Sequence, residues 1–282
     1  MSAPDFDLRQ TLESGQVFHW RGDDAGWRGV IGNEVVRVEQ VGETLRVSPG
    51  HEDLVYRYFG LDHPLQEIVA SFPRDAAMDA ARDFCRGMRI IRQEPWECVA
   101  TFITSAMKQV PHIRQISLTL RERYGEQIAP SLHTYPTPEQ LASAGEAELR
   151  TAKLGFRAKN LALAARMIAD GTVDLGSIRS LPTREARVEL CRLPGVGEKV
   201  ANCALLFAYE RLEAFPIDVW IERVLRELYF NRKRNVTARR LREFAAEYFG
   251  PFAGYAQQYL FHHARKTRRK RRDENRCHTE SC

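Results

Sequence analysis

The sequence lacks the features of a secreted, disulfide-stapled or membrane protein. Its six cysteines, at positions 85, 98, 191, 203, 277 and 282, form no paired framework, which suits a reducing compartment. No apolar run approaches the length of a membrane span. The first residues, MSAPDFDLRQ, lack the basic-then-apolar layout of a signal peptide. We therefore expect a protein that does not associate with a membrane.

A bulk positive charge is also missing. The net charge is +5, but seven positive charges fall within residues 265–272, so the other 274 residues sum to −2. Residues 267–282 carry too many charges and too few apolar side chains to pack, and we expect a disordered tail. Cys277, His278 and Cys282 in this tail are too few to define a metal site. Any affinity for nucleic acid must therefore come from local features.

The first 50 residues are rich in strand signals. Residues 34–40 (EVVRVEQ) and 44–49 (TLRVSP) alternate or cluster β-branched side chains and are separated by a turn at Gly42. A second turn is expected at Gly32. This pattern predicts an antiparallel meander.

From about Asp53 the apolar spacing becomes helical. A long buried helix is expected to begin near Pro95, and Thr137 is expected to cap another helix. We therefore predict an α+β protein, in which an N-terminal antiparallel sheet domain (1–95) packs on an all-helical domain (96–266), followed by the tail.

A glycine turn between two predicted helices provides the first functional signal. Gly195 and Gly197 flank Val196 in a turn for which we expect backbone conformations that other residues tolerate poorly. A tight turn that leads into a helix leaves N–H groups pointing outward at the positive end of the helix dipole. Such a hairpin binds an anion, and in a nucleic-acid protein the anion is a backbone phosphate.

Two side chains near this turn suggest chemistry. Lys199 lies in the first turn of the following helix, whose later positions are apolar. The helix N-terminus and partial burial both disfavour a charged amine, and an uncharged amine can attack carbon and form a Schiff base. Asp218 precedes an amphipathic helix and is expected to be its N-cap. We expect this carboxylate to remain ionised, ready to stabilise positive charge or move a proton.

These motifs resemble a known family. LPGVGEKVANCALLFAY followed by FPIDVW is similar to the helix-hairpin-helix DNA glycosylase superfamily, and the lysine–aspartate pair resembles its bifunctional glycosylase/lyase members. TLESGQVFHW, YFGLD, LGFRAK and QQYLFHHAR narrow the resemblance to the 8-oxoguanine DNA glycosylase family. The resemblance spans roughly residues 8–265. Endonuclease III-type relatives have four closely spaced cysteines for an iron–sulfur cluster after the helical core, whereas only two cysteines lie there in this chain, so we expect no cluster and no other cofactor.

The resemblance implies four contacts to an extruded base. In the family the carbonyl of Gly15 faces N7, which carries a hydrogen in the oxidised base and is an acceptor in normal guanine. Gln257 would meet the Watson–Crick edge, and Phe261 and Cys203 would hold the two faces. Each aromatic stack contributes about 1–3 kcal/mol.

The resemblance also implies residues that bind the rest of the duplex. Family members have three asparagines and an arginine where residues 107–112 here read MKQVPH. Gln109 would fill the gap left by the flipped base and His112 would stand in for the arginine. We therefore expect a relaxed preference for cytosine opposite the lesion.

Further DNA contacts are implied on other segments. Phe156 would wedge beside the orphaned base and Arg157 would contact it, while the turn of residues 195–197 would hold phosphate. Trp220 stands where the family usually has a phosphate-binding histidine, and its indole N–H could donate one bond.

Without the resemblance, several of these residues have ordinary structural explanations. The Ser14–Gly15 pair would be a strand-entry turn, Cys203 a small buried apolar residue and Phe261 a core aromatic. The Gly155–Phe156 step would be packing between helices.

The predicted activity is excision of 8-oxoguanine from duplex DNA by Schiff-base chemistry at Lys199, followed by β-elimination at the abasic site. The alternatives are a non-catalytic hairpin protein that only holds DNA, and a glycosylase for another damaged base, such as an alkylated purine. We expect a monomer whose partner is double-stranded DNA, located in the cytoplasm or nucleoid of a bacterium or the nucleus of a eukaryote.

Overall fold

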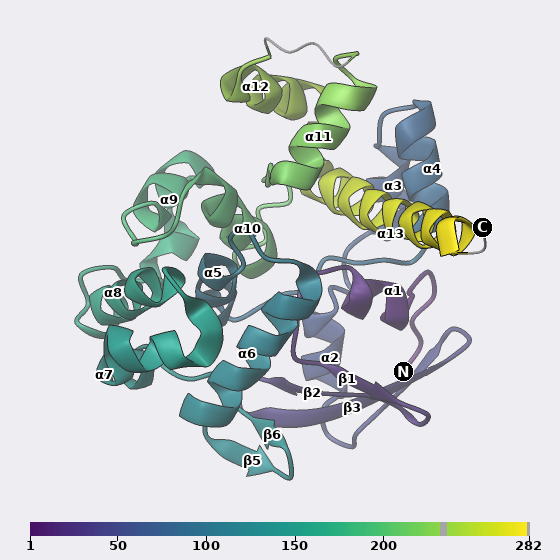
Figure 1. The fold of residues 1–282 in the computed structure, drawn as a ribbon. Helices are drawn as coiled ribbons and strands as arrows, with labels where there is room; N and C mark the ends of the chain where they lie inside the picture. Colours follow the sequence, from purple (N-terminus) through teal and green to yellow (C-terminus); the bar gives the residue numbers. More distant parts are fainter. Residues whose placement is uncertain (232–235, 281–282) are drawn as a thin grey trace.

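The computed structural model describes residues 1–231 and 236–280, with side chains to residue 267. A small antiparallel sheet lies against a larger array of helices (Figure 1). The N-terminal elements are α1 (Leu8–Glu13), β1 (Arg21–Asp23), β2 (Gly26–Ile31), β3 (Glu34–Val41), β4 (Thr44–Val47), α2 (Glu52–Tyr58), α3 (Leu65–Ala70) and α4 (Ala76–Phe84). The α+β class is confirmed.

The sheet is the predicted meander, with strand order β1-β2-β3-β4 and every pair antiparallel. Val36 and Val38 of β3 and Leu45 of β4 are fully buried on one face. They pack with Trp20 and Phe59, because alternate residues of a strand point to the same side of a sheet. This face forms a first hydrophobic core.

The long helix predicted to begin near Pro95 is α5, which starts at that residue. Thr137 caps α7 in a reciprocal capping box with Gln140, as predicted for the threonine. The helices and short strands are α5 (Pro95–Thr104), α6 (Val110–Tyr124), β5 (Gln127–Ala129), β6 (Leu132–His133), α7 (Pro138–Leu149), η1 (Arg150–Leu154), α8 (Arg157–Ala169), η2 (Ser177–Ser180), α9 (Thr183–Leu190), α10 (Glu198–Ala208), α11 (Val219–Leu228), α12 (Ala238–Tyr248), η3 (Gly250–Phe252) and α13 (Ala253–Glu280).

The second core divides the chain differently from the sequence-based boundary at residue 95. Apolar side chains of α3 and α4, including Ile68 and Met78, pack with the helical core, whereas Ile91 packs with the sheet core. In Figure 1, α3 and α4 lie beside α13 and away from the sheet. Residues before position 95 therefore contribute to both cores. A division of the chain at residue 95 does not separate the two cores.

Helices α10 and α13 approach closely at one glycine. A Cβ on Gly254 would lie 2.3 Å from Cδ1 of Leu206 and 2.7 Å from the Ala214 carbonyl oxygen. Cys203 lies one turn before Leu206, and Gln257 lies one turn after Gly254. This crossing therefore brings the predicted catalytic helix and the predicted base-binding helix together.

The last helix continues where a disordered tail was expected from composition. The α13 backbone is helical through Glu280. Arg, Lys and Glu are good helix formers, and extending an existing helix avoids the cost of nucleating a new one. Of the helices in the described ranges, each is too short or too polar to cross a bilayer.

Candidate active site

Lys199 is held in the first turn of α10, whose next nine residues, Val200–Ala208, are buried. Its amine donates a hydrogen bond to the Ser105 hydroxyl (3.4 Å) and lies 4.8 Å from the centre of the Phe102 ring. Both partners come from the end of α5. The lysine is therefore directed into the protein, and only part of its side chain meets solvent.

Asp218 is the N-cap of α11, as predicted, and accepts a hydrogen bond from the Ile221 N–H (2.8 Å). Burial raises the pKa of this carboxyl, against the opposing effects of the Ile221 N–H and the Lys199 charge. The expectation that capping alone would keep the carboxylate ionised therefore missed the largest influence, which is removal from water. A carboxyl so placed can both take up and release a proton near the lysine.

The glycine turn has the predicted shape at one of its two glycines. Gly195 has φ +84°, and a Cβ there would lie 2.9 Å from Asn160 and 3.2 Å from Ile103. Gly197 has φ −96° and ψ −177°, an extended conformation open to any residue, and a Cβ there would meet nothing within 4 Å. The expectation that both glycines need unusual backbone angles is therefore wrong for Gly197. Its value lies in the open surface that it leaves at the start of α10.

Val196 anchors the turn through its buried side chain and a backbone hydrogen bond. Its side chain is buried, and its N–H donates to the carbonyl of Leu193 (3.0 Å). Gly197 is the N-cap of α10 and has no side chain with which to cap the first turn. The amides of Glu198 and Lys199 are thus available at the positive end of the helix, which is the predicted anion site.

Gly15 and Phe261 come together although they lie far apart in the sequence. Gly15 has φ +92°, and a Cβ there would lie 3.2 Å from Cε1 of Phe261. The flanking segment is fixed by buried side chains, since Gln258 donates to the Ser14 carbonyl (3.1 Å) and Gln93 donates to the Gln16 carbonyl (3.1 Å). The Gly15 backbone is therefore held in place against α13.

Gln257 is buried with an unmatched polar atom. It is 4% exposed, and its Oε1 has no hydrogen-bond partner among the described residues. A buried amide oxygen without a donor costs free energy unless a ligand supplies one. Cys203 is also buried, and burial raises the pKa of its thiol to about 11, so it is a neutral, polarisable surface beside Lys199.

The loop between α5 and α6 is exposed and strained. Met107 is 92% exposed and has φ +54°, an uncommon conformation for a side chain of this kind. Gln109 and His112, on the next turn, are also exposed. The structure therefore presents Met107, Gln109 and His112, at the end of the loop and the start of α6, to solvent, where a duplex can reach them.

Phe156 and Arg157 occupy different environments. Phe156 is 59% exposed, after a chain reversal with positive φ at Lys153 and Gly155. Arg157 is 5% exposed, stacks 4.2 Å from the Phe156 ring centre and donates from Nε to the Ala106 carbonyl (2.7 Å). In this structure Arg157 therefore supports the exposed loop rather than facing solvent.

Trp220 lies in the first turn of α11, two residues after Asp218, with the Arg223 guanidinium 5.8 Å from its ring centre.

The sequence did not indicate the hydrogen bond between Lys199 and Ser105, which are 94 residues apart. Ser105 is a small polar residue at a helix end, and its sequence context contains no motif.

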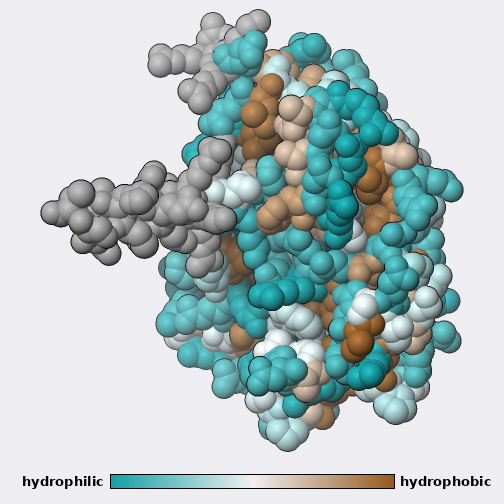
Figure 2. Space-filling model, turned by 90° about the vertical axis from the view of Figure 1, so that its right-hand side faces the viewer, coloured by the Kyte–Doolittle hydropathy of each residue, from teal (hydrophilic) through white to brown (hydrophobic). Residues whose placement is uncertain are grey.

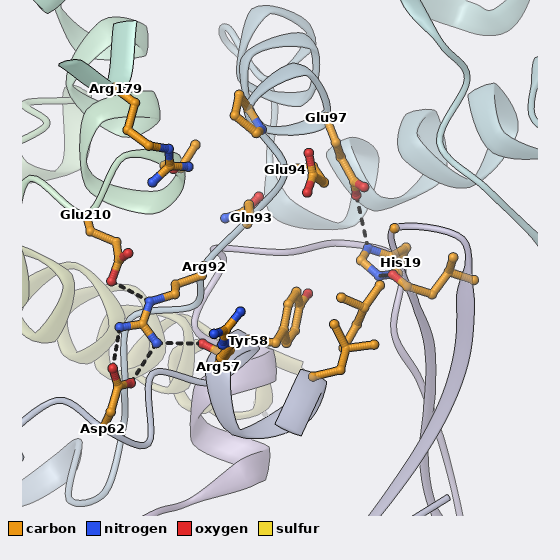
Figure 3. Close-up of a pocket in the computed structure, with 16 residues that line it drawn as sticks. His19, Arg57, Tyr58, Asp62, Arg92, Gln93, Glu94, Glu97, Arg179 and Glu210 are labelled. Carbon is orange, nitrogen blue, oxygen red and sulfur yellow. Dashed lines mark hydrogen bonds and ion pairs between the residues drawn. The ribbon is translucent and has the colours of Figure 1, made fainter. Parts of the chain in front are cut away.

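A large cavity lies elsewhere, between the sheet and the helical part (Figure 3). It has a volume of about 480 Å³ and is crossed by ion pairs from Arg92 to Asp62 and Glu210. Its lining residues include His19, which pairs with Glu97, but none of the predicted site residues. The cavity mixes both signs of charge and follows the seam between the two cores.

Comparison with known proteins places the chain in a family. Residues 1–99 match the family model "8-oxoguanine DNA glycosylase, N-terminal domain", and residues 100–251 match "HhH-GPD superfamily base excision DNA repair protein". A "Probable N-glycosylase/DNA lyase" from Methanothermobacter thermautotrophicus is 30% identical over an alignment 300 positions long, which covers 93% of this chain and 95% of the relative.

Solved structures agree over the same length. An 8-oxoguanine glycosylase/lyase from Clostridium acetobutylicum, in complex with DNA that has cytosine opposite 8-oxoguanine, is 30% identical with a TM-score of 0.88, covering 95% of this chain and 98% of its own. MBOgg1 in complex with a low-affinity DNA ligand is 34% identical with a TM-score of 0.88, covering 93% of each chain. The chain belongs to the 8-oxoguanine DNA glycosylase family, within the HhH-GPD superfamily of base excision DNA repair proteins.

Proposed function

We propose that this protein excises 8-oxoguanine from double-stranded DNA and then nicks the strand at the abasic site, as a bifunctional N-glycosylase and DNA lyase. The observation that carries the proposal is the Lys199 amine, half-buried against Ser105 and Phe102 at the end of α5 and near enough to the buried Asp218 for its charge to oppose the rise in the pKa of that carboxyl. A protein that only holds DNA through its hairpin has no need for this pair. The names of the full-length relatives support the same activity.

The reaction begins with capture of the damaged strand. The amides at the start of α10 hold a phosphate of the strand, and the exposed side chains of residues 107–112 enter the space left by the extruded base. Met107 and His112 replace the family's asparagine and arginine in this loop. A relaxed preference for the base opposite the lesion follows from that replacement.

The extruded base is recognised by groups from both cores. The Gly15 carbonyl accepts a hydrogen bond from N7–H of 8-oxoguanine and repels the N7 lone pair of guanine. The unmatched Oε1 of Gln257 accepts a second hydrogen bond from the Watson–Crick edge, which removes its burial cost. Phe261 stacks on one face, and Cys203 packs against the other.

Lys199 then replaces the base. The neutral amine attacks C1′ as the bond from C1′ to N9 breaks. The base leaves with the bonding electrons and takes up the proton that the attacking nitrogen releases. The Asp218 carboxylate stabilises the positive charge on the sugar in the transition state. Ring opening gives a Schiff base; loss of a proton from C2′ expels the 3′ phosphate, and water finally releases the lysine.

Borohydride trapping tests the nucleophile. Reduction should link the protein covalently to a duplex containing 8-oxoguanine, and Lys199→Gln should abolish the adduct while DNA binding remains. A Lys199→Gln protein that still formed the adduct would show that another residue is the nucleophile.

A panel of damaged duplexes tests the substrate. Excision should be fastest for 8-oxoguanine and should vary little among the four opposite bases. Faster release of an alkylated purine would favour the alternative glycosylase, and a cytosine preference of roughly several hundredfold, about 3 kcal/mol or more, would contradict the proposed role of residues 107–112.

A further inference from the structure

The Lys199 amine is held by the end of α5, a segment that the sequence did not connect with catalysis. Ser105 Oγ lies 3.4 Å from Nζ, and the Phe102 ring centre lies 4.8 Å from it. An amine on a four-carbon chain has several rotamers, and a nucleophile reacts fast only when it is held close to the attacked carbon. The two α5 groups restrict that freedom.

The hydrogen-bonding role of the Ser105 hydroxyl toward Lys199 is fixed by its other partner. It donates its hydrogen to the Phe102 carbonyl (2.8 Å), so it faces Lys199 with oxygen lone pairs. Its side chain is 7% exposed, which limits competition from water. Ser105 therefore acts as a hydrogen-bond acceptor toward the amine.

Ser105 also begins the exposed loop that is proposed to enter the duplex. The next carbonyl, of Ala106, is held by the Arg157 guanidinium, and the next residue is the strained, exposed Met107. The Lys108 N–H returns to the Ser105 carbonyl (3.1 Å). The hydroxyl that meets Lys199 is thus two residues from a side chain that DNA would contact, within one closely bonded turn.

We propose that Ser105 is a positioning residue for Lys199, and that Arg157 fixes Ser105 through the Ala106 carbonyl, so that the loop entering the DNA also sets the location of the nucleophile. The inference rests on the proposed function, because it takes Lys199 as the attacking group. It adds a role for the α5 end that the lysine–aspartate pair alone does not supply.

The test compares Ser105→Ala with a matched variant one residue away. Thr104 makes the same type of bond, from its hydroxyl to the Thr101 carbonyl (2.9 Å), and is 1% exposed. Thr104→Val removes that bond and preserves side-chain volume. Both variants lose a hydroxyl at the end of α5, and Ser105→Ala alone loses the contact to Lys199.

The measurements are single-turnover base release at saturating duplex, borohydride trapping, affinity for a duplex with an uncleavable abasic analogue, and urea unfolding. Ser105→Ala should slow release and trapping by roughly ten- to a hundredfold, with affinity unchanged. Thr104→Val should match the native rates after any change in stability is taken into account. Equal rates for the two variants, or a loss in Ser105→Ala explained by weaker binding, would overturn the proposal.

A double-mutant cycle tests the Arg157 link. Lysine cannot reproduce the guanidinium fork on the Ala106 carbonyl, so Arg157→Lys should slow base release at saturating DNA. Combined with Ser105→Ala it should add less than the sum of the single effects, because both act through one position. Additive effects would refute the link through Ala106. These results are separable from the nucleophile assignment, which depends on Lys199→Gln alone.

Discussion

At Gly15 two requirements coincide in one residue. Its φ of +92° disfavours any side chain, and a Cβ would press on the Phe261 ring at 3.2 Å. In the proposed mechanism the carbonyl of this residue also meets the extruded base. Gly50 offers a comparison, because its φ is +81° and a Cβ there would meet nothing within 4 Å.

Gly15→Ala and Gly50→Ala should therefore have different effects. Each should lower the free energy of unfolding by about 1 kcal/mol or somewhat more through backbone strain. Only Gly15→Ala should also reduce excision of 8-oxoguanine at saturating DNA, because it displaces the Phe261 ring. Urea unfolding and single-turnover kinetics measure the two effects, and an equal loss of excision in both variants would show that strain alone matters.

Asp218 is proposed to act as a buried carboxylate, and keeping it ionised in the folded protein lowers the free energy of unfolding. Burial raises its pKa above the usual 3.8, so the folded protein holds this proton more tightly than the unfolded chain. Folding is therefore penalised as the carboxyl ionises, and the penalty is complete only above the raised pKa.

Asp218→Asn keeps an oxygen that can cap α11 and removes the charge. Its free energy of unfolding, relative to the native protein, should rise with pH through the acid range above the unfolded value of 3.8 and then level off. Base excision should fall sharply, since the stabilising carboxylate is lost. Urea titrations at a series of pH values provide the check; a native protein that gains relative stability as pH rises would contradict the burial argument.

At the scale of the element, the two glycines of the turn at residues 195–197 have different roles, one in packing and one in the proposed binding of DNA. Gly195 packs against Asn160 of α8 and Ile103 of α5, whereas Gly197 faces open space. Gly195 therefore lets the hairpin pack closely against α5 and α8, and Gly197 leaves open space for a DNA strand at the start of α10.

Gly195→Ala should be destabilised by about 1–3 kcal/mol, because strain and overpacking add. Gly197→Ala should change stability little, because the lower entropy of the unfolded chain offsets the poorer N-cap preference of alanine. It should bind duplex DNA more weakly, because the methyl group occupies the phosphate side. Thermal unfolding and fluorescence anisotropy distinguish the two. If Gly197→Ala bound DNA as well as the native protein, the phosphate would have to lie elsewhere.

At the scale of the whole molecule, the site lies where two cores meet. Gly15 belongs to the N-terminal segment, and Lys199 and Phe261 belong to helices of the larger core. The surface in Figure 2 is mainly hydrophilic, with separate hydrophobic patches. Action as a monomer stays a prediction from the sequence.

Truncation after Thr267 addresses the basic C-terminal residues. Among the side chains described, which end at residue 267, the last that packs on the helical core is Ala264. The shortened protein should therefore fold and excise 8-oxoguanine at low salt. Its affinity for undamaged duplex should fall, and the slope of log K against log salt should become shallower by a few units as phosphate contacts are lost. An unchanged slope would show that residues 268–282 do not contact DNA.

The sequence by itself determined the fold class, the meander, the caps at Thr137 and Asp218 and the left-handed backbone at Gly195, because each depends on local spacing or on a backbone preference. Strings such as LPGVGEK and FPIDVW also indicated the family. Local patterns do not state which residues meet across the chain.

Only the tertiary structure decided the rest. It placed Ser105 against Lys199, buried Arg157 under the exposed loop, left Gln257 with an unmatched oxygen, and raised the pKa of Asp218. It also assigned α3 and α4 to the helical core. Each of these follows from packing between distant segments, since burial and long-range contacts control the position and protonation of a side chain.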